Sequence, residues 1–278
     1  MLVCDNAQGR YGNAIFRYLA SSLFCILYNA KRTYNTCECN ITISDSDFIN
    51  WSNSVLSGHI PDIDLSKNYL FRGYYQHDRI FLKYKSQLIQ HIFDNPNDNL
   101  VTDGNIADRY GNYHYNVEIY KSCNLIVPNN TDKSYDIVVH LRLEDFVSVN
   151  QVIHPKCIYE VLQNFKHLDI CFVFNKPTTP FEHKYIHFFT SQFNIVCESN
   201  DAITDFHIMK NAKTLICSRS TLSWAASFFS QTLETLYFPN YDYPDRLHET
   251  FKYPITNTIL YDIYHASEYD ISMFLDSI

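Results

Sequence analysis

The sequence predicts an α/β protein whose second half forms a parallel, doubly wound sheet. From residue 136 onward, short apolar segments of strand type alternate with longer segments of helical spacing. Such alternation is typical of βαβ units, in which the strands run parallel. A second observation is that Arg142 and Ser218 each follow an apolar run directly. Because ligands of such sheets bind beyond the carboxyl ends of the strands, these two residues are the first candidates for a binding site.

The elements of this half follow from the apolar periodicity. We expect strands at 137–141, 170–174, 195–197, 215–217 and 235–238. Helices are expected between them at 155–167, 181–192, 201–211 and 221–231. Pro155 suits a first helical turn, and Asp201 suits an N-cap.

The first half is less regular. A strand at 2–4 leads through a glycine turn into a helix at 14–28, and a strand at 41–43 lies in an otherwise irregular, polar stretch from 31 to 66. An aromatic strand that ends in a polar cluster at 68–78 and a helix at 80–93 follow. The polar segment 128–134 is the best linker in the chain. It predicts two domains, residues 1–133 and 134–278.

Composition excludes several classes of function. The chain has 278 residues, 46% of them hydrophobic, which suits one large or two ordinary globular domains. A net charge of −8 argues against nucleic-acid binding, although a few local Arg residues suffice for a small anion. Apolar stretches are too short for a membrane span, and no secretory signal is visible. We expect a soluble cytoplasmic protein whose nine cysteines are reduced.

In the segment from Asp136 to Phe146, a His, an Arg and an Asp stand at the end of a predicted strand. On its own, such a segment fits a buried strand with a charged surface turn. The second segment of interest, Cys217 to Ala226, is a strand end, a hydroxyl-rich turn and a helix start. An ordinary N-cap needs only one of its hydroxyls. Together, an Arg and a helix N-terminus at neighbouring strand ends form a seat for a diphosphate, because a guanidinium binds phosphate in bidentate fashion.

Four segments, in order, resemble the alpha-1,2-fucosyltransferase family, which is related to the alpha-1,6- and protein O-fucosyltransferases. The first, Gly9 to Tyr18, is similar to a glycine, two residues and then Gly-Asn at the start of a helix. The second, Gly73-Tyr74-Tyr75-Gln76, is similar to a Gly-Tyr-Phe/Tyr-Gln segment. The third, His140-Leu141-Arg142, matches the family's His-x-Arg. The last has two pieces, Asp205-Phe206 through Met209 and Ser218 through Trp224, which resemble its closing Ser-x-Ser-x-Ser-Trp block.

The resemblance implies a GT-B architecture, with two Rossmann-like domains whose parallel sheets face across a cleft. It implies metal-independent, inverting sugar transfer without a cofactor, from a nucleotide sugar to a glycan. Arg142 and His140 would be catalytic, with His140 supporting Arg142 or touching the donor. The donor would be bound by Arg10, Gly12, Asn13, Asp145, Ser218, Ser220, Thr221 and Ser223. The acceptor side of the cleft would hold Tyr75, Gln76, Asp78 and Glu144, and Glu144, Asp145 and Asp78 are candidates for the general base.

One departure bears on the donor. The alpha-1,2 family has two consecutive Arg and then Gly-Asp, where this chain has Leu143, Glu144 and Asp145 after Arg142. GDP-fucose is the first choice of donor, and another nucleotide sugar such as UDP-xylose is the alternative. A different class of function is a non-catalytic glycan-binding module, motivated by the aromatic content and the missing Arg. A dinucleotide-dependent dehydrogenase fits less well, because the glycines lack the G-x-G-x-x-G spacing. The predicted lack of a signal and membrane anchor suits a bacterial or virus-encoded enzyme.

Overall fold

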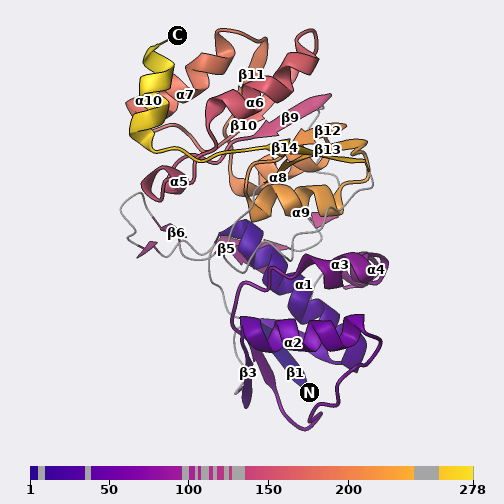
Figure 1. The fold of residues 1–278 in the computed structure, drawn as a ribbon. Coiled ribbons are helices and arrows are strands. Elements are labelled where there is room, and N and C mark those ends of the chain that lie inside the picture. Colours follow the sequence, from indigo (N-terminus) through magenta and orange to yellow (C-terminus); the bar gives the residue numbers. More distant parts are fainter. Residues whose placement is uncertain are drawn as a thin grey trace. The chain divides into compact units, whose positions relative to one another are not determined.

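The computed structural model describes residues 1–5, 10–34, 39–95, 100–103, 106–107, 113–114, 118–121, 125–126, 135–240 and 257–277 (Figure 1). The chain divides into two compact units. Unit 1 comprises Met1–Ile106, Tyr115–Val127 and Tyr243–Lys252, and unit 2 comprises Ala107–His114, Pro128–Asp242 and Tyr253–Ile278. Among the helices described, none is long and apolar enough to cross a membrane.

Unit 1 is built on a four-stranded parallel sheet in the order β2-β1-β4-β3. Its strands are β1 (Leu2–Asp5), β2 (Lys31–Tyr34), β3 (Ile41–Ile43) and β4 (Tyr69–Phe71), and its helices are α1 (Tyr11–Tyr28), α2 (Asp45–Leu56), α3 (Asp78–Lys83) and α4 (Lys85–Asp94). β5 (Leu100–Asp103) pairs antiparallel with β8 (Glu118–Lys121). A second two-stranded sheet joins β6 (Ile106–Ala107), at the boundary of the two units, and β7 (Tyr113–His114), which belongs to unit 2. The strand order reverses between β1 and β4, so their carboxyl ends border the place where a ligand would bind.

Helix α1 begins earlier than the sequence suggests, at Tyr11, with Arg10 as N-cap residue. Its side chains are buried over most of its length, and it ends at Asn29, whose left-handed backbone lets its N–H donate to the carbonyl of Cys25. Helix α2 was not expected from the sequence. It starts with a capping box in which the Ser44 hydroxyl accepts from the Asp47 N–H and the Asp47 carboxylate accepts from the Ser44 N–H.

The predicted helix at 80–93 forms as two helices, α3 and α4, which are interrupted at Tyr84. The cysteines also differ from expectation. Cys4 is disulfide-bonded, so the prediction that all cysteines are reduced is wrong at this position. Free thiols are present at Cys25, Cys39, Cys157, Cys171, Cys197 and Cys217.

Unit 2 contains a six-stranded parallel sheet in the order β11-β10-β9-β12-β13-β14. The strands are β9 (Ile137–His140), β10 (Ile170–Val173), β11 (Ile195–Glu198), β12 (Thr214–Ile216), β13 (Thr235–Asn240) and β14 (Thr258–Asp262). The helices are α5 (Asp145–Ser148), α6 (Pro155–Leu162), α7 (Pro180–Thr190), α8 (Ala202–Lys210), α9 (Thr221–Phe229) and α10 (Glu268–Asp276), and a short 3₁₀ turn, Gln163–Phe165, follows α6. This confirms the expected parallel, doubly wound sheet, and the α/β class with two parallel sheets holds for the chain.

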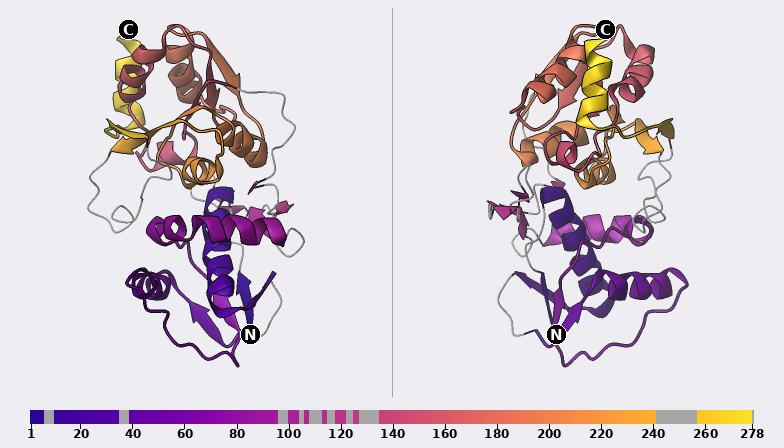
Figure 2. Two further views of the ribbon diagram at one scale, coloured as in Figure 1. Left: turned by 90° about the vertical axis from the view of Figure 1, so that its right-hand side faces the viewer. Right: turned by 60° about the vertical axis from the view of Figure 1, so that its left-hand side comes forward.

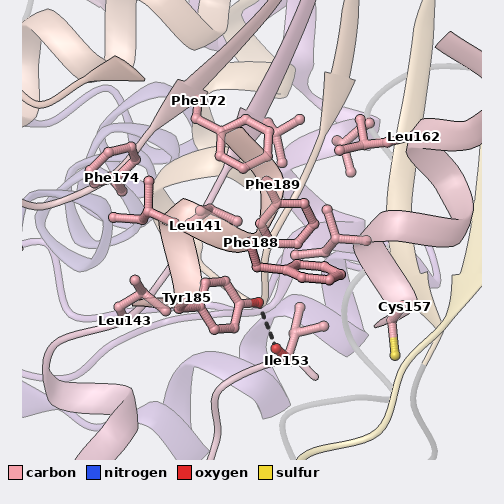
Figure 3. Packing of buried hydrophobic residues seen from close by; sticks show 14 of the residues in the cluster. Leu141, Leu143, Ile153, Cys157, Leu162, Phe172, Phe174, Tyr185, Phe188 and Phe189 are labelled. Atoms are coloured by element: carbon pink, nitrogen blue, oxygen red, sulfur yellow. Dashed lines mark hydrogen bonds between the residues drawn. The ribbon is translucent and has the colours of Figure 1, made fainter. Parts of the chain in front are cut away.

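Both faces of the unit 2 sheet are covered, which is why its central strands are apolar without interruption. One face, to which Ile137, Val139 and Phe172 contribute, packs in a core with side chains of α6, α7 and α10 (Figure 3). Val138 and Leu215 alternate onto the other face, on which α8 contacts β9 and β10. Helix α10, drawn in yellow, lies beside α7 in Figures 1 and 2. β14 and α10 were not expected from the sequence.

Candidate functional site: the switch point of unit 2

The strand order of unit 2 reverses between β9 and β12, and polar side chains gather where these two strands end. β9 ends at His140 and β12 ends two residues before Ser218. The Ser218 Oγ lies 2.8 Å from the His140 Nδ1 in a buried hydrogen bond. Neighbouring parallel strands that diverge at a switch point leave a crevice at their carboxyl ends. The His140–Ser218 bond therefore ties together the two walls of that crevice.

Burial keeps His140 neutral. Its side chain is 3% exposed, and desolvation, with the charge of Arg142 as the smaller cause, lowers the pKa of His140 to about 3. A neutral imidazole has one ring nitrogen that donates and one that accepts, so it can exchange a hydrogen bond with the Ser218 hydroxyl. His140 thus links the end of β9 to the Ser218 turn, and both its support of Arg142 and its contact with a donor stay predictions.

The low pKa of His140 should make the stability of the folded chain depend on pH. Its pKa is about 3 when folded and near 6.5 when unfolded, so the unfolded chain binds the extra proton below pH 6.5. Stability is therefore lost as pH falls from 6.5 toward 3, by about 2 kcal/mol between pH 7 and 5. Urea unfolding of wild type and His140→Gln at both pH values measures this term. Equal losses in the two proteins would show that His140 does not contribute it.

Arg142 lies two residues beyond the end of β9 and is held by its neighbours. Its Nη2 donates to the Asp145 Oδ2 at 2.9 Å, and its guanidinium carbon lies 5.4 Å from the centre of the Phe146 ring. The Arg142 side chain is 12% exposed and that of Asp145 is 25% exposed. Asp145, expected to bind the donor, is in this structure the ion-pair partner of Arg142.

Leu143 occupies the position at which the resembled family carries its second Arg. Its side chain is 3% exposed and belongs to the hydrophobic core of unit 2, where Figure 3 shows it with Tyr185. A charged side chain at this position would have to be desolvated or turned out of the core. The residue after Arg142 therefore supplies packing and no charge to the crevice.

Glu144 has a backbone conformation that favours glycine, with φ +42° and ψ −108°. Two hydrogen bonds hold it there. The N–H of Phe146 donates to the Leu143 carbonyl at 2.8 Å, and the Glu144 N–H donates to the Glu182 Oε1 at 3.2 Å. Strained residues persist only where surrounding contacts determine them, and they cluster at functional sites. The strained turn sets the path of the chain between Arg142 and Asp145.

Replacing Glu144 by glycine should leave the fold intact and raise stability slightly. Relief of positive-φ strain is worth about 1–2 kcal/mol, and the greater entropy of an unfolded glycine removes about 0.5–1 kcal/mol of it. Glu144→Val, which keeps the strain and adds a β-branch, should lower stability instead. Thermal unfolding of the two variants measures both effects. Equal melting temperatures for the Gly and Val variants would argue against strain at this position.

In the hydroxyl-rich turn between β12 and α9, some hydroxyl groups form hydrogen bonds with the backbone of the same segment. Ser220 is the N-cap of α9 and accepts from the Leu222 N–H at 3.2 Å. Ser223 is fully buried, and its hydroxyl donates to the Ser220 carbonyl at 3.1 Å. Thr221 opens the helix and is partly exposed. Phosphate contacts from Ser218, Ser220, Thr221 and Ser223 stay a prediction, and Ser223 points to the backbone of its own turn.

A narrow recess opens beside Arg142. Its volume is ≈ 10 Å³, and its lining includes Arg142, Gln151, Ser218 and Arg219. That volume holds about one water molecule, so a larger anion would bind at its mouth. Arg219 and Gln151 were not among the expected site residues. The signal for Arg219 was present in the sequence, since it is a cation inside a turn otherwise assigned to phosphate binding.

Unit 1 brings together two of its expected site residues at its own switch point. The Gln76 Nε2 donates to the Asn13 Oδ1 at 3.0 Å, which joins the first turn of α1 to the segment after β4. Asn13 is the third residue of α1 and does not cap it. Arg10 and Gly12 lie in the same first turn, where Arg10 is partly exposed and Gly12 is buried. Gly9, which opens the expected motif, lies outside the described residues.

Two expected cleft residues of unit 1 are buried. Tyr75 is 1% exposed, has φ +52°, and donates its hydroxyl to the Ile43 carbonyl at 2.6 Å. Its ring packs on Phe48 and Phe71. Asp78 is fully buried at the start of α3. Tyr75 is thus part of the core, and Asp78 in this state is not open to an acceptor, because burial of both side chains leaves no surface for contact.

An open depression on unit 1 lies elsewhere. It has a volume of ≈ 740 Å³ and lies between the carboxyl end of α1, at Cys25 and Asn29, and the face of α4 that carries Gln87 and His91. Asn13 is at the other end of α1, roughly 24 Å away at 1.5 Å per residue. Being shallow and open, this depression does not compete with the switch points as the functional site.

Comparisons with known proteins add a structural neighbour. No protein-family model matches the chain, and no curated protein matches it. A solved structure of the fucosyltransferase FUT1 from Arabidopsis thaliana, a mutant in complex with GDP, is similar with a TM-score of 0.42 and 10% sequence identity. The similarity covers 84% of this chain and 69% of that one. Values this low do not assign a family, so the functional conclusion has to come from the geometry of the site.

Proposed function

We propose that the chain is a glycosyltransferase that moves a sugar from a nucleoside diphosphate to a hydroxyl of a glycan. L-fucose from GDP-fucose is the first choice. The observation that supports this is the switch point of unit 2. His140 and Ser218 join the ends of β9 and β12 there, and Arg142 lines a recess together with Ser218 and Arg219 of the turn that leads into α9. An Arg and a helix N-terminus at one crevice suit the charge and shape of a diphosphate.

In the proposed reaction, the bond between the anomeric carbon and the diphosphate oxygen breaks. Its electron pair leaves with the diphosphate, while the acceptor oxygen bonds to the anomeric carbon from the opposite face and gives its proton to a base. Arg142 and the α9 N–H dipoles would stabilise the charge that grows on the diphosphate, which favours the transition state over the ground state. This scheme uses no metal, and transfer should persist in EDTA.

Asp145 would act through Arg142, because its carboxylate already holds the Arg142 Nη2. The base would be a carboxylate near the reacting centre, and Glu144 is a candidate because it is partly exposed and Asp145 is engaged by Arg142. In unit 1, the Asn13–Gln76 pair offers amide groups to a sugar or its donor.

The identity of the nucleotide is the part of the proposal with an open alternative. Because Leu143 is buried, only one Arg comes from the strand β9 exit, and a UDP-sugar such as UDP-xylose is the second candidate donor. The glycan-binding alternative has less support. Its motivation was the aromatic content, and many of these rings, among them Phe48, Phe71 and Trp224, are in the cores.

A screen of thermal shifts against GDP, UDP, GDP-fucose and UDP-xylose tests the proposal. A ligand that binds only the folded chain raises stability by RT ln(1 + [L]/Kd), about 2.7 kcal/mol at 100 Kd. The nucleotide that gives a shift is then assayed for sugar release and for transfer to oligosaccharides. Absence of both a shift and turnover with every nucleotide sugar would overturn the proposal. Glycan binding without any nucleotide effect would favour the binding module.

A further inference from the structure

Arg219 is a second guanidinium at the crevice of unit 2, and it comes from a different strand than Arg142. It lies three residues after the end of β12 and two residues before α9 begins. Arg142 lies two residues after the end of β9, which is the neighbour of β12 in the sheet. Both residues line the same recess, together with Ser218. Two cationic residues from adjacent strand ends therefore border one small space.

Convergence of like charges is unfavourable unless an anion compensates for it. Asp145 pairs with Arg142, and the recess that both Arg residues line has a volume of only ≈ 10 Å³. Among the described residues that line it, none is a carboxylate. A diphosphate at the mouth of the recess would offer two phosphate groups to two guanidinium groups, each of which can bind in bidentate fashion.

A histidine from the segment after β14 contacts Arg219. The Arg219 Nη1 lies 3.4 Å from the His265 Nε2, and His265 forms an isolated β-bridge with Ile153, which lines the recess. Desolvation, followed by the charge of Arg219, lowers the pKa of His265. A neutral His265 can accept from the guanidinium through Nε2, whereas a protonated one would repel it. His265 is thus a positioning residue for Arg219.

We propose that Arg219 is the second guanidinium of the diphosphate site and replaces, from the β12–α9 turn, the charge that the buried Leu143 does not provide. This inference rests on the proposed function and goes beyond it. It explains how a chain with one Arg after β9 would neutralise two phosphates. The second positive charge would come from the end of β12 instead of the end of β9, and the binding site would stay at the same recess.

The test is calorimetric titration of the full chain with GDP, UDP and GMP. Arg219→Ala should weaken binding of the preferred nucleoside diphosphate about tenfold or more, and binding of the monophosphate much less, because one charged contact is lost from the second phosphate. Arg219→Lys keeps the positive charge but not the planar guanidinium, so its affinity for the diphosphate should lie between those of the wild type and Arg219→Ala. Lys213→Ala is the control. Lys213 lies at the other end of β12, is 57% exposed and pairs with Asp136, so its loss removes one charge at a distance from the recess.

The outcomes separate the two proposals. One outcome removes Arg219 from the site while the proposed function stands. In that outcome, the wild type binds a diphosphate, Arg142→Ala loses this binding, and Arg219→Ala keeps the wild-type affinity for diphosphate and monophosphate. If wild type binds no nucleoside diphosphate and releases no sugar, both proposals fail. Melting temperatures without ligand identify variants that have lost the fold. His265→Ala should weaken diphosphate binding in the same direction as Arg219→Ala, and unchanged binding would remove the positioning role.

Discussion

Replacing Arg142 by alanine should abolish sugar transfer while leaving the fold intact. We expect the turnover number to fall by about 10²- to 10³-fold or more, because one fixed donor to a growing negative charge in a closed site has that value. Arg142→Lys should recover little of it, since an ammonium group cannot bind two phosphate oxygens in bidentate fashion. Single-turnover assays with the preferred nucleotide sugar measure the loss.

The stability of Arg142→Ala separates a functional role from a structural one. The ion pair with Asp145 is partly exposed and joins residues three apart, and such pairs contribute about 1 kcal/mol or less. The melting temperature should therefore change by only a few degrees. A large loss of stability with normal turnover of the protein that stays folded would show that Arg142 is structural. A stable variant that still transfers sugar at the wild-type rate would show that Arg142 has no catalytic role. Asp145→Asn is a companion variant that should reduce turnover less than Arg142→Ala, since it leaves the guanidinium in the site.

Replacing Gly73 by alanine should destabilise unit 1 by about 3 kcal/mol. A Cβ at this position would lie 2.8 Å from the Cγ and Oδ1 of Asp45. Asp45 cannot move aside without loss, because its Oδ1 accepts from the N–H groups of Tyr74 at 2.9 Å and Tyr75 at 2.6 Å. The same turn positions Gln76 for its hydrogen bond to Asn13, so the rate of sugar transfer should fall as well. Urea unfolding of the variant measures the loss of stability.

Gly58→Ala is the matched control for Gly73→Ala. Gly58 has φ +95° and nothing within 4 Å of an added Cβ, so alanine there meets backbone strain and no contact, with an expected loss of about 1–2 kcal/mol. A double-mutant cycle identifies the cause at Gly73. In an Asp45→Ala background, the clash is removed and Gly73→Ala should be nearly neutral. Equal losses in both backgrounds would show that Asp45 is not what requires the glycine.

Much of the fold was predictable because its signals are local. The apolar strands and the helices between them in unit 2 follow from periodicity, and Asp201 caps α8 as expected. Helix α2 was missed because it buries only Phe48, Ser52 and Val55, too few for a clear apolar stripe. Its capping box at Ser44 was the signal that could have identified it. The predicted helix at 80–93 is interrupted at Tyr84, a break that its apolar spacing does not show.

For the site, the sequence by itself determined which residue types stand at the strand exits. His140, Arg142 and Ser218 follow apolar runs, and Gly73 to Gln76 follow an aromatic one. Only the tertiary structure decided what each does, because strand order and side-chain direction depend on contacts far along the chain. It placed β12 next to β9 and so bonded Ser218 to His140, 78 residues apart. The tertiary structure also buries Leu143 and Tyr75 in the cores, and it places Arg219 at the recess that Arg142 lines.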